Sequence, residues 1–175
     1  NNDGKQVSAR VAWRPTAGLA LGVSGARGEY LDRQAQETLP AFARDRTFRQ
    51  RAAGADVEYA RGHWMWRGEA VWCEWDAAAM SEPLLGDTLT ALAWTVEGRY
   101  AFWPGLHVAA RLDRLDFGDI LGSEGPASWE APVWRIETGL GYAVMRQLTI
   151  KAVYQRNRRD GGFVRGNDLV AVQGI

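Results

Sequence analysis

The chain lacks several features that mark common protein classes. Its single cysteine, Cys73, excludes an internal disulfide framework and a Cys-x-x-Cys metal motif. No run of about 18 apolar residues occurs, so we expect no membrane-spanning helix. Basic and acidic residues number 21 each, and this net charge of zero gives no support to a nucleic-acid partner. The first residues, Asn1-Asn2-Asp3-Gly4, do not resemble a signal peptide.

Glycine and tryptophan, in contrast, are abundant. The 175 residues include 20 Gly and 9 Trp, a combination that suits packed β-structure with many stacked or interfacial rings. Hydrophobic residues make up 46 % of the chain, as in an ordinary soluble protein. This value does not exclude a membrane protein, because a barrel strand needs only about ten residues and only half of them face lipid.

Apolar and polar residues alternate with a period of two along most of the chain, which is typical of β-strands with two different faces. Near the start, Val7, Ala9, Val11 and Trp13 share one face, and Arg10 lies on the other. The pattern predicts an all-β protein with about nine strands. We expect these strands at about 5–14, 19–28, 51–60, 64–75, 89–102, 106–117, 132–144, 148–157 and 168–175.

The connections between these strands alternate between short and long. The short ones are tight turns such as Pro15-Thr16-Ala17-Gly18 and Trp103-Pro104-Gly105. This alternation is typical of antiparallel up-and-down outer-membrane β-barrels, which have short periplasmic turns and long external loops, and nothing in a soluble sandwich requires it. We therefore interpret residues 1–175 as a single segment of a transmembrane β-barrel. The long loops are expected at about 29–48, 76–88, 118–131 and 158–167.

Aromatic residues lie near both ends of several predicted strands. Trp134 and Tyr142 are eight residues apart, which corresponds to roughly 20 Å along the axis of a barrel whose strands tilt by about 40°. That distance is close to the apolar band of about 25 Å between the aromatic girdles of such barrels. The alternative is that the rings fill the core of a soluble β-sandwich or stack on sugars. The predicted interface aromatics are Trp13, Tyr59, Trp64, Trp66, Trp72, Trp94, Tyr100, Phe102, Trp134, Tyr142 and Tyr154.

The opposite face of the same strands carries charged residues far from the strand ends. Unpaired buried charges are prohibitively unfavourable, so these groups must face water or pair with one another. A hydrated lumen allows both, and a solvated face of a soluble sheet is the alternative. Six of the residues are basic and six acidic, which indicates no preference for anions or cations. The predicted pore-lining residues are Arg10, Asp56, Glu58, Arg67, Glu69, Glu97, Arg99, Arg111, Asp113, Arg135, Glu137 and Lys151.

Four short stretches, mostly in the second half of the chain, carry a resemblance to a known family. They are Val96-Glu97-Gly98-Arg99-Tyr100, the segment 109–116, the segment 148–155, and the segment 167–173. On these stretches the chain resembles the carboxyl-terminal part of the phosphate-selective porin-like family of Gram-negative outer-membrane proteins. The resemblance implies a barrel of about 16 to 18 strands, usually trimeric, through which small solutes diffuse.

Two departures from that family suggest an incomplete barrel. The chain ends at Ile175 without the terminal aromatic residue that such barrels usually carry, and the predicted strand number is odd and low. We therefore expect further strands before Asn1 and a few residues after Ile175.

A search for catalytic patterns gives no candidate. His63 and His107 are expected at short turns as surface residues, without a Ser, Cys or carboxylate partner at a recognisable spacing. Gly139-Leu140-Gly141 is not followed by a predicted helix and is not interpreted as a phosphate loop. We expect no enzymatic activity, no cofactor and no metal site.

The sequence thus favours an outer-membrane porin that passes small hydrophilic solutes or ions by passive diffusion through a charged lumen. Two alternatives remain open: a scaffold barrel that encloses or docks a partner protein, and a soluble all-β carbohydrate-binding module. The expected partners are the lipid bilayer of the bacterial outer membrane, small solutes or ions, and further subunits of a homotrimer or a larger membrane complex.

Overall fold

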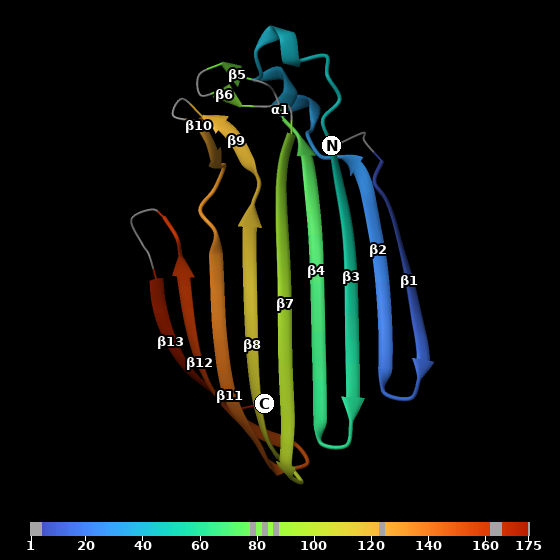
Figure 1. Ribbon diagram of the computed structural model, residues 1–175, viewed down its shortest axis with the longest axis vertical. Helices are drawn as coiled ribbons and strands as arrows, with labels where there is room; N and C mark the ends of the chain where they lie inside the picture. The colour runs from blue at the N-terminus through green and yellow to red at the C-terminus, as the bar shows by residue number, and fades with distance from the viewer. Residues whose placement is uncertain are drawn as a thin grey trace.

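The computed structural model describes residues 5–77, 80–81, 84–85, 88–122, 125–161 and 166–174. Nine antiparallel strands form one sheet in which every strand pairs with its neighbours along the meander (Figure 1). The all-β, antiparallel, up-and-down arrangement predicted from the sequence is confirmed. In sheet order the strands are β1 (Val7–Thr16), β2 (Leu19–Glu29), β3 (Arg49–Arg61), β4 (Trp64–Asp76), β7 (Thr88–Trp103), β8 (Leu106–Phe117), β11 (Val133–Met145), β12 (Leu148–Arg159) and β13 (Gly166–Gly174).

Tight turns connect the strands at one end of the sheet. Gly18 adopts a φ of 82°, in the left-handed region that glycine enters without steric cost. The carbonyl of Gly18 accepts a hydrogen bond of 2.6 Å from Ala60 N, on β3. The next turns follow the same pattern, because His63 O accepts from Ala101 N and Gly105 O accepts from Ala143 N. These three turns are therefore each bound to the strand that follows their own hairpin.

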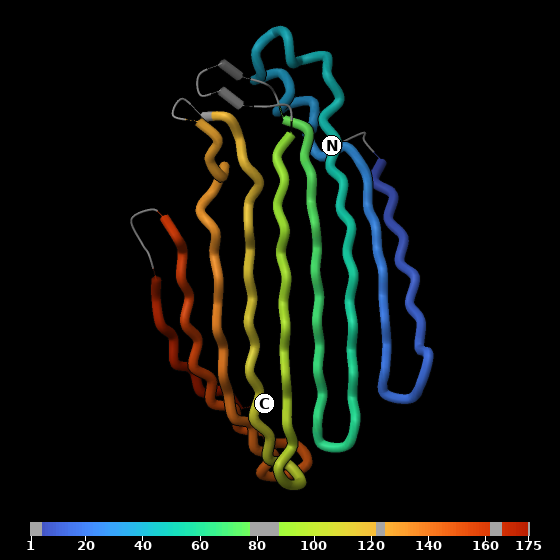
Figure 2. The backbone as a smooth tube through the Cα atoms, in the orientation of Figure 1, coloured from blue at the N-terminus to red at the C-terminus, as the bar shows by residue number. Residues whose placement is uncertain are grey.

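The opposite end of the sheet carries the long connections, which contain structure of their own (Figure 2). Asp32 caps the first helix by accepting a hydrogen bond from Ala35 N at 2.7 Å. Among the described residues, neither helix is long or apolar enough to cross a bilayer. The elements in these connections are α1 (Arg33–Glu37), the 3-10 helix Ala41–Ala43, β5 (Met80–Ser81), β6 (Leu84–Leu85), β9 (Asp119–Gly122) and β10 (Gly125–Ser128).

The most deeply buried apolar side chains lie at this loop end and not in the middle of the sheet. Among the described residues, Ala43, Phe48, Ala77 and Ala91 are the buried hydrophobic ones, and Phe48 is 2 % exposed. Three of these four residues lie in the long connections or at a strand boundary next to them, and Ala91 lies near the start of β7. A small hydrophobic core therefore holds the loops together.

Aromatic side chains tie these loops to the strands. Trp129 donates its indole N–H to Thr90 O at 2.7 Å and packs edge-on against Phe117, with ring centroids 4.7 Å apart. Tyr30 donates its hydroxyl to Asp76 O at 2.6 Å. Burial raises the pKa of Tyr30 above its usual value, and the nearby Asp76 carboxylate adds to this rise. Direct hydrogen bonds to the strands therefore hold two of the long connections.

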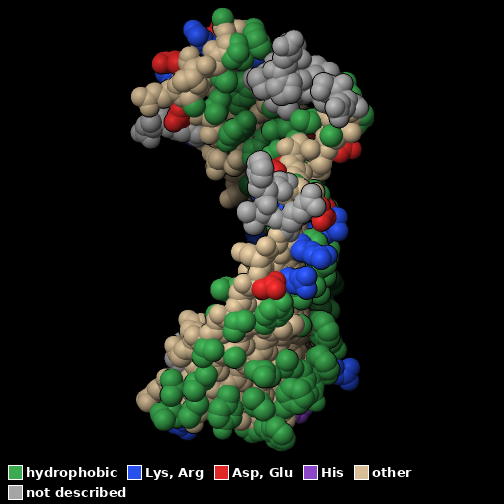
Figure 3. All heavy atoms as spheres, turned by 90° about the vertical axis from the view of Figure 1, so that its left-hand side faces the viewer, with side chains coloured by type: hydrophobic (Ala, Val, Ile, Leu, Met, Phe, Trp, Pro, Cys, Tyr) green, Lys and Arg blue, Asp and Glu red, His purple; other side chains and the backbone are tan. Residues whose placement is uncertain are grey.

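The sheet is a single curved layer with two different faces. Residues paired across strands share a face, and the register places Val23, Ala55 and Ala70 on one face in neighbouring strands. This outward face is apolar, and its side chains are exposed: Val170 and Val172, on β13, are each 74 % exposed. No second sheet covers it within the described part of the chain. Figure 3 shows the hollow on the opposite side, below the overhanging loops.

The buried phenylalanine of the loop core gives a first prediction. Phe48→Ala removes a ring that is almost fully buried and should destabilise the packing of the 29–49 connection by about 3 kcal/mol. We expect faster proteolytic cleavage in this connection, with no change in the heat-dependent gel mobility that reports an intact barrel. Phe42→Ala is the matched control, because Phe42 lies in the same connection and is 65 % exposed. Equal cleavage rates in the two variants would contradict a core built on Phe48.

Candidate functional site

The register places all twelve predicted pore-lining residues on the same face of the sheet, which we call the inner face. It also places all eleven predicted interface aromatics on the other, outward face. The two sets belong to the same strands. Successive residues of a strand point to opposite faces, so the two sets occupy alternate positions, and we call this alternation the parity of a residue. The charged set comprises Arg10 on β1, Asp56 and Glu58 on β3, Arg67 and Glu69 on β4, Glu97 and Arg99 on β7, Arg111 and Asp113 on β8, Arg135 and Glu137 on β11, and Lys151 on β12.

A ladder of alternating charges crosses the inner face. In register order it consists of Glu58, Arg67, Glu97, Arg111 and Glu137, on β3, β4, β7, β8 and β11. Glu58 and Arg67 form an ion pair of 2.8 Å, and each of the other residues lies opposite a residue of the other sign. Opposite charges on directly paired positions stabilise a sheet, whereas like charges destabilise it. The ladder therefore keeps five charged groups on one face at little electrostatic cost.

A second ion pair spans three strands. Arg10, on β1, reaches across β2 and donates to both carboxylate oxygens of Asp56, on β3, at 2.7 and 2.8 Å. The residue between them is Gly22, and a Cβ atom there would lie 2.7 Å from Arg10 Nη2 and still closer to Asp56. The absence of a side chain at Gly22 thus leaves the space that the ion pair occupies.

Asp113 is the centre of a third polar cluster, on the loop side of the ladder. Its Oδ1 accepts a hydrogen bond from Thr95 Oγ1 and another from Arg111 Nε, the latter at 2.8 Å. On the next strands, Arg135 Nε donates to Asn157 Oδ1 at 2.9 Å. A hollow of about 440 Å³ adjoins Asp113 and Arg135 on the inner face. Polar side chains are thus fixed around an open space in this part of the sheet.

Between the ladder and the short turns, the inner face of the described strands carries basic residues and no acidic one. Arg99, His107 and Lys151 border a hollow of about 220 Å³ over Gly139, whose lining also includes Glu97, Arg111 and Glu137 of the ladder. Neither Arg99 nor Lys151 forms an ion pair with any residue that the structure describes. The inner face is therefore basic toward the turns, although the charges of the twelve residues balance.

The position of His107 corrects an expectation from the sequence. His107 is not a surface residue of a turn but the second residue of β8, paired with Gly141 on the inner face. Its ring occupies the space above Gly141, where a Cβ atom would overlap it. The alternation with Ala109 and Arg111 along β8 could have placed His107 on this face; its proximity to the Trp-Pro-Gly turn obscured that signal.

On the outward face, rings gather near the short turns of β4 and β7. The rings of Trp64 and Trp66 stack with centroids 5.4 Å apart, and the ring of Tyr100 lies 4.6 Å from Trp64 and 4.9 Å from Phe102. Trp66 also covers Gly98, where a Cβ atom would lie 2.7 Å from its ring. Rings at this end of the strands match one of the two predicted aromatic levels.

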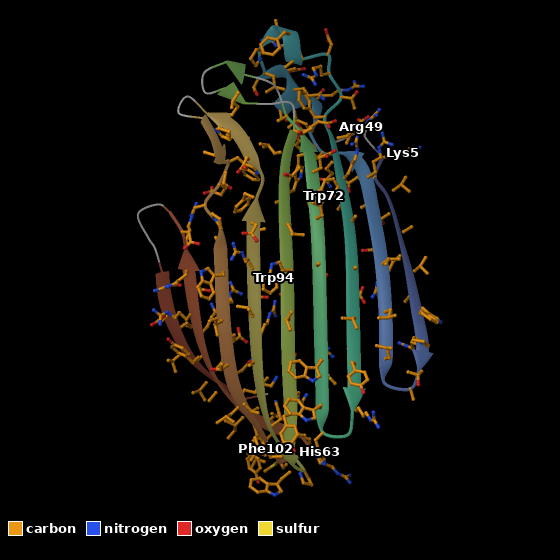
Figure 4. The ribbon with its side chains drawn as sticks, in the orientation of Figure 1. Lys5, Arg49, His63, Trp72, Trp94 and Phe102 are labelled. Atoms are coloured by element: carbon orange, nitrogen blue, oxygen red, sulfur yellow. The ribbon has the colours of Figure 1, made fainter. Side chains whose placement is uncertain are left out.

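The second level is less regular than expected. Trp94 is the seventh residue of β7, which begins at Thr88, so it lies in the interior of the strand and not at its loop end. It pairs with Ala70, one outward position closer to the turns than the pair of Trp72 and Leu92 (Figure 4). The predicted range of this strand, about 89–102, agrees with β7 to within one residue at each end, so the height of Trp94 reflects its place within the strand and not a shift of the strand boundary.

Comparison with known proteins gives matches of fold only. No protein-family model matches the chain, and no curated protein matches it. Among solved structures, outer-membrane expressed OmpT of Vibrio cholerae is 15 % identical with a TM-score of 0.64, covering 89 % of this chain and 46 % of its own length. A trimer form of in-vitro folded OmpT is 12 % identical with a TM-score of 0.63, covering 98 % and 54 %.

The structure of OpdK of Pseudomonas aeruginosa with vanillate is 16 % identical with a TM-score of 0.55, covering 98 % of this chain and 49 % of that one. The chain therefore spans about half the length of the proteins that it resembles. The chain forms a nine-stranded antiparallel sheet that is apolar on its outward face and charged on its inner face. Together with these likenesses, this sheet shows that the chain has the fold of a bacterial outer-membrane β-barrel.

Proposed function

We propose that this chain forms part of the wall of an outer-membrane porin, through which small hydrophilic solutes or ions pass by passive diffusion. The observation that carries the proposal is the inner face, where charged side chains from seven strands point to the same side as the hollow of the sheet. No protein covers these ion-paired charges in the described part of the chain. Water must therefore fill the space that they border, because charged groups without solvent are strongly unfavourable.

The comparisons support a proposed size for the complete barrel. Nine strands occupy about half the length of the OmpT and OpdK chains, so a complete protein of similar length would have about 16 to 18 strands. A barrel of that size leaves an aqueous channel. OmpT has a trimer form, and we extend to this protein the proposal of a homotrimer.

The inner face also indicates which solutes would pass best. Arg99, His107 and Lys151 line a hollow together with Glu97 and Glu137 of the ladder. On the turn side of the ladder the inner face of the described strands carries no acidic residue, so a solute with a carboxylate or phosphate group would meet favourable charges on that side. OpdK has been studied with vanillate, a carboxylate. We propose no catalytic step for this face.

A scaffold barrel that encloses a partner protein is the second candidate. The inner face of β2 favours it, because it carries the small side chains of Ala20, Ser24 and Ala26. A barrel occupied by a partner would not conduct ions, which separates the two functions.

The test is single-channel recording of the full-length protein in planar lipid bilayers. A porin should give stable conductance steps at neutral pH in potassium chloride, whereas a barrel that inserts but never conducts would overturn the proposal. Insertion is checked independently by protease protection of the barrel in vesicles.

Charge removal on the turn side of the inner face should change ion selectivity. The double variant Arg99→Gln/Lys151→Gln should shift the reversal potential in a potassium chloride gradient toward cation preference, because two unpaired positive charges leave the lumen. Arg51→Gln is the control, since Arg51 lies on the outward face and pairs with Glu74 at 2.7 Å. An unchanged reversal potential in the double variant would show that these residues do not line the conducting path.

Glycine 22 provides a structural test of the same face. Gly22→Ala should displace the flexible ends of Arg10 and Asp56, break their ion pair and lower the unfolding free energy by up to about 1 kcal/mol. Urea unfolding in lipid vesicles, followed by tryptophan fluorescence, measures this change. Gly25→Ala should have little effect, because a Cβ atom there makes ordinary contact at 3.7 Å. In an Arg10→Ala background, Gly22→Ala should lower the unfolding free energy by less, because the ion pair is already absent. An equal loss of unfolding free energy in both backgrounds would show that the ion pair is not its cause.

A further inference from the structure

Tryptophan and arginine alternate along one row of the outward face. Trp94, Arg114, Trp134 and Arg158 are directly paired in register across β7, β8, β11 and β12. An arginine on a lipid-facing surface lowers the stability of a barrel strongly near the middle of the bilayer and hardly at all near the membrane interface. The row therefore marks the height at which the apolar band ends on this side of the sheet.

The residues below and above this row agree with that assignment. From Tyr154 toward the turn, the outward residues of β12 are Tyr154, Ala152, Ile150 and Leu148, none of which is charged. From Arg156 toward the loops, the outward residues are Arg156 and Arg158. Figure 3, viewed from the β13 side, shows basic side chains gathered directly above the hydrophobic lower part. The guanidinium groups thus lie where lipid headgroups meet acyl chains.

A narrow slot opens on the outward face at the same place. Its volume is about 170 Å³, and it is lined by Trp134, Ile136, Arg156 and Arg158. All four residues have outward parity, so the slot faces lipid and not the lumen. The indole, the isoleucine side chain and the aliphatic stems of the arginines give it apolar walls, while the two guanidinium groups bring positive charge to it.

These two arginines are more weakly partnered than Arg51 and Arg114, two other outward arginines. Arg156 lies 3.9 Å from Asp168, and both side chains are more than half exposed. Arg158 forms no ion pair with a residue that the structure describes. Arg114, in contrast, holds Asp116 at 2.7 Å. Asp168 therefore contacts Arg156 only at the limit of an ion pair, whereas Asp116 is already held by Arg114.

We propose that this slot binds one anionic, phosphate-bearing lipid of the leaflet next to the long loops. The guanidinium groups of Arg156 and Arg158 donate charge-assisted hydrogen bonds to the phosphate, and an acyl chain packs against Trp134 and Ile136. Gly166, opposite Arg158 on β13, leaves lateral room for the headgroup because it has no side chain. In the outer membrane, lipid A, a phosphorylated glycolipid, has the required chemistry. This binding site is independent of whether the barrel conducts.

The experiment uses the full-length protein, purified in detergent, delipidated and titrated with lipid A while bound lipid is counted by native mass spectrometry. We expect wild type to bind one lipid A molecule more tightly than phosphatidylcholine. Arg156→Gln/Arg158→Gln should weaken lipid A binding about tenfold, because each arginine near a lipid headgroup adds favourable charge interaction. Arg51→Gln, an outward arginine that has its own carboxylate partner, is the matched control and should bind as wild type does. Unchanged heat-dependent gel mobility shows that the variants are folded.

Four outcomes would overturn the proposal. They are equal binding of lipid A by wild type and the double variant, an equal loss in Arg51→Gln, equal affinity for phosphatidylcholine, and competition by inorganic phosphate alone at the concentration of lipid A. A change of oligomeric state in the double variant without a change in lipid binding would assign the slot to contact with a second copy of the chain instead, and would also overturn the proposal.

Discussion

Lateral pairing of backbone groups is the constraint on which the rest of this structure depends. Within hydrocarbon an unpaired N–H or C=O group costs several kcal/mol, so a strand can remain there only if neighbours take its hydrogen bonds on both sides. Seven of the nine strands have two neighbours in the sheet, and β1 and β13 have one each among the described strands. Once the strands are paired in this way, alternate residues of each strand face opposite sides of the sheet, one toward lipid and the other toward water.

This parity explains why the charged residues need so little packing around them. On the inner face, Glu58, Arg67 and Glu97 neutralise one another across strands, and none of them is buried. On the outward face the apolar residues are as exposed as surface residues of a soluble protein, and only lipid removes them from water. The deepest protein core, around Phe48, belongs to the loops. Lipid therefore stabilises the wall, whereas side-chain packing stabilises the loop end.

Much of the fold was readable from the sequence because its determinants are local. Alternation over ten residues and a glycine in each of three tight turns are sufficient to define the hairpins and the face on which Arg67 or Trp64 lies. The register between strands is not local. That Arg67 lies opposite Glu97, or that Arg10 reaches over Gly22 to Asp56, depends on how separate hairpins align. The loop core at Phe48 is likewise not local, because it depends on how separate connections pack. The inner-face position of His107, in contrast, follows from the alternation along β8.

The hydrogen bonds between each turn and the next hairpin have a consequence for how such a wall can change in evolution. The carbonyls of Gly18, His63 and Gly105 each accept a hydrogen bond from a strand of the following hairpin, so these three hairpins contact the next hairpin in the same way. Gain or loss of one hairpin would alter the circumference of a closed barrel by two strands and leave the parity of every remaining residue unchanged. Pore width and wall chemistry can therefore vary independently of each other.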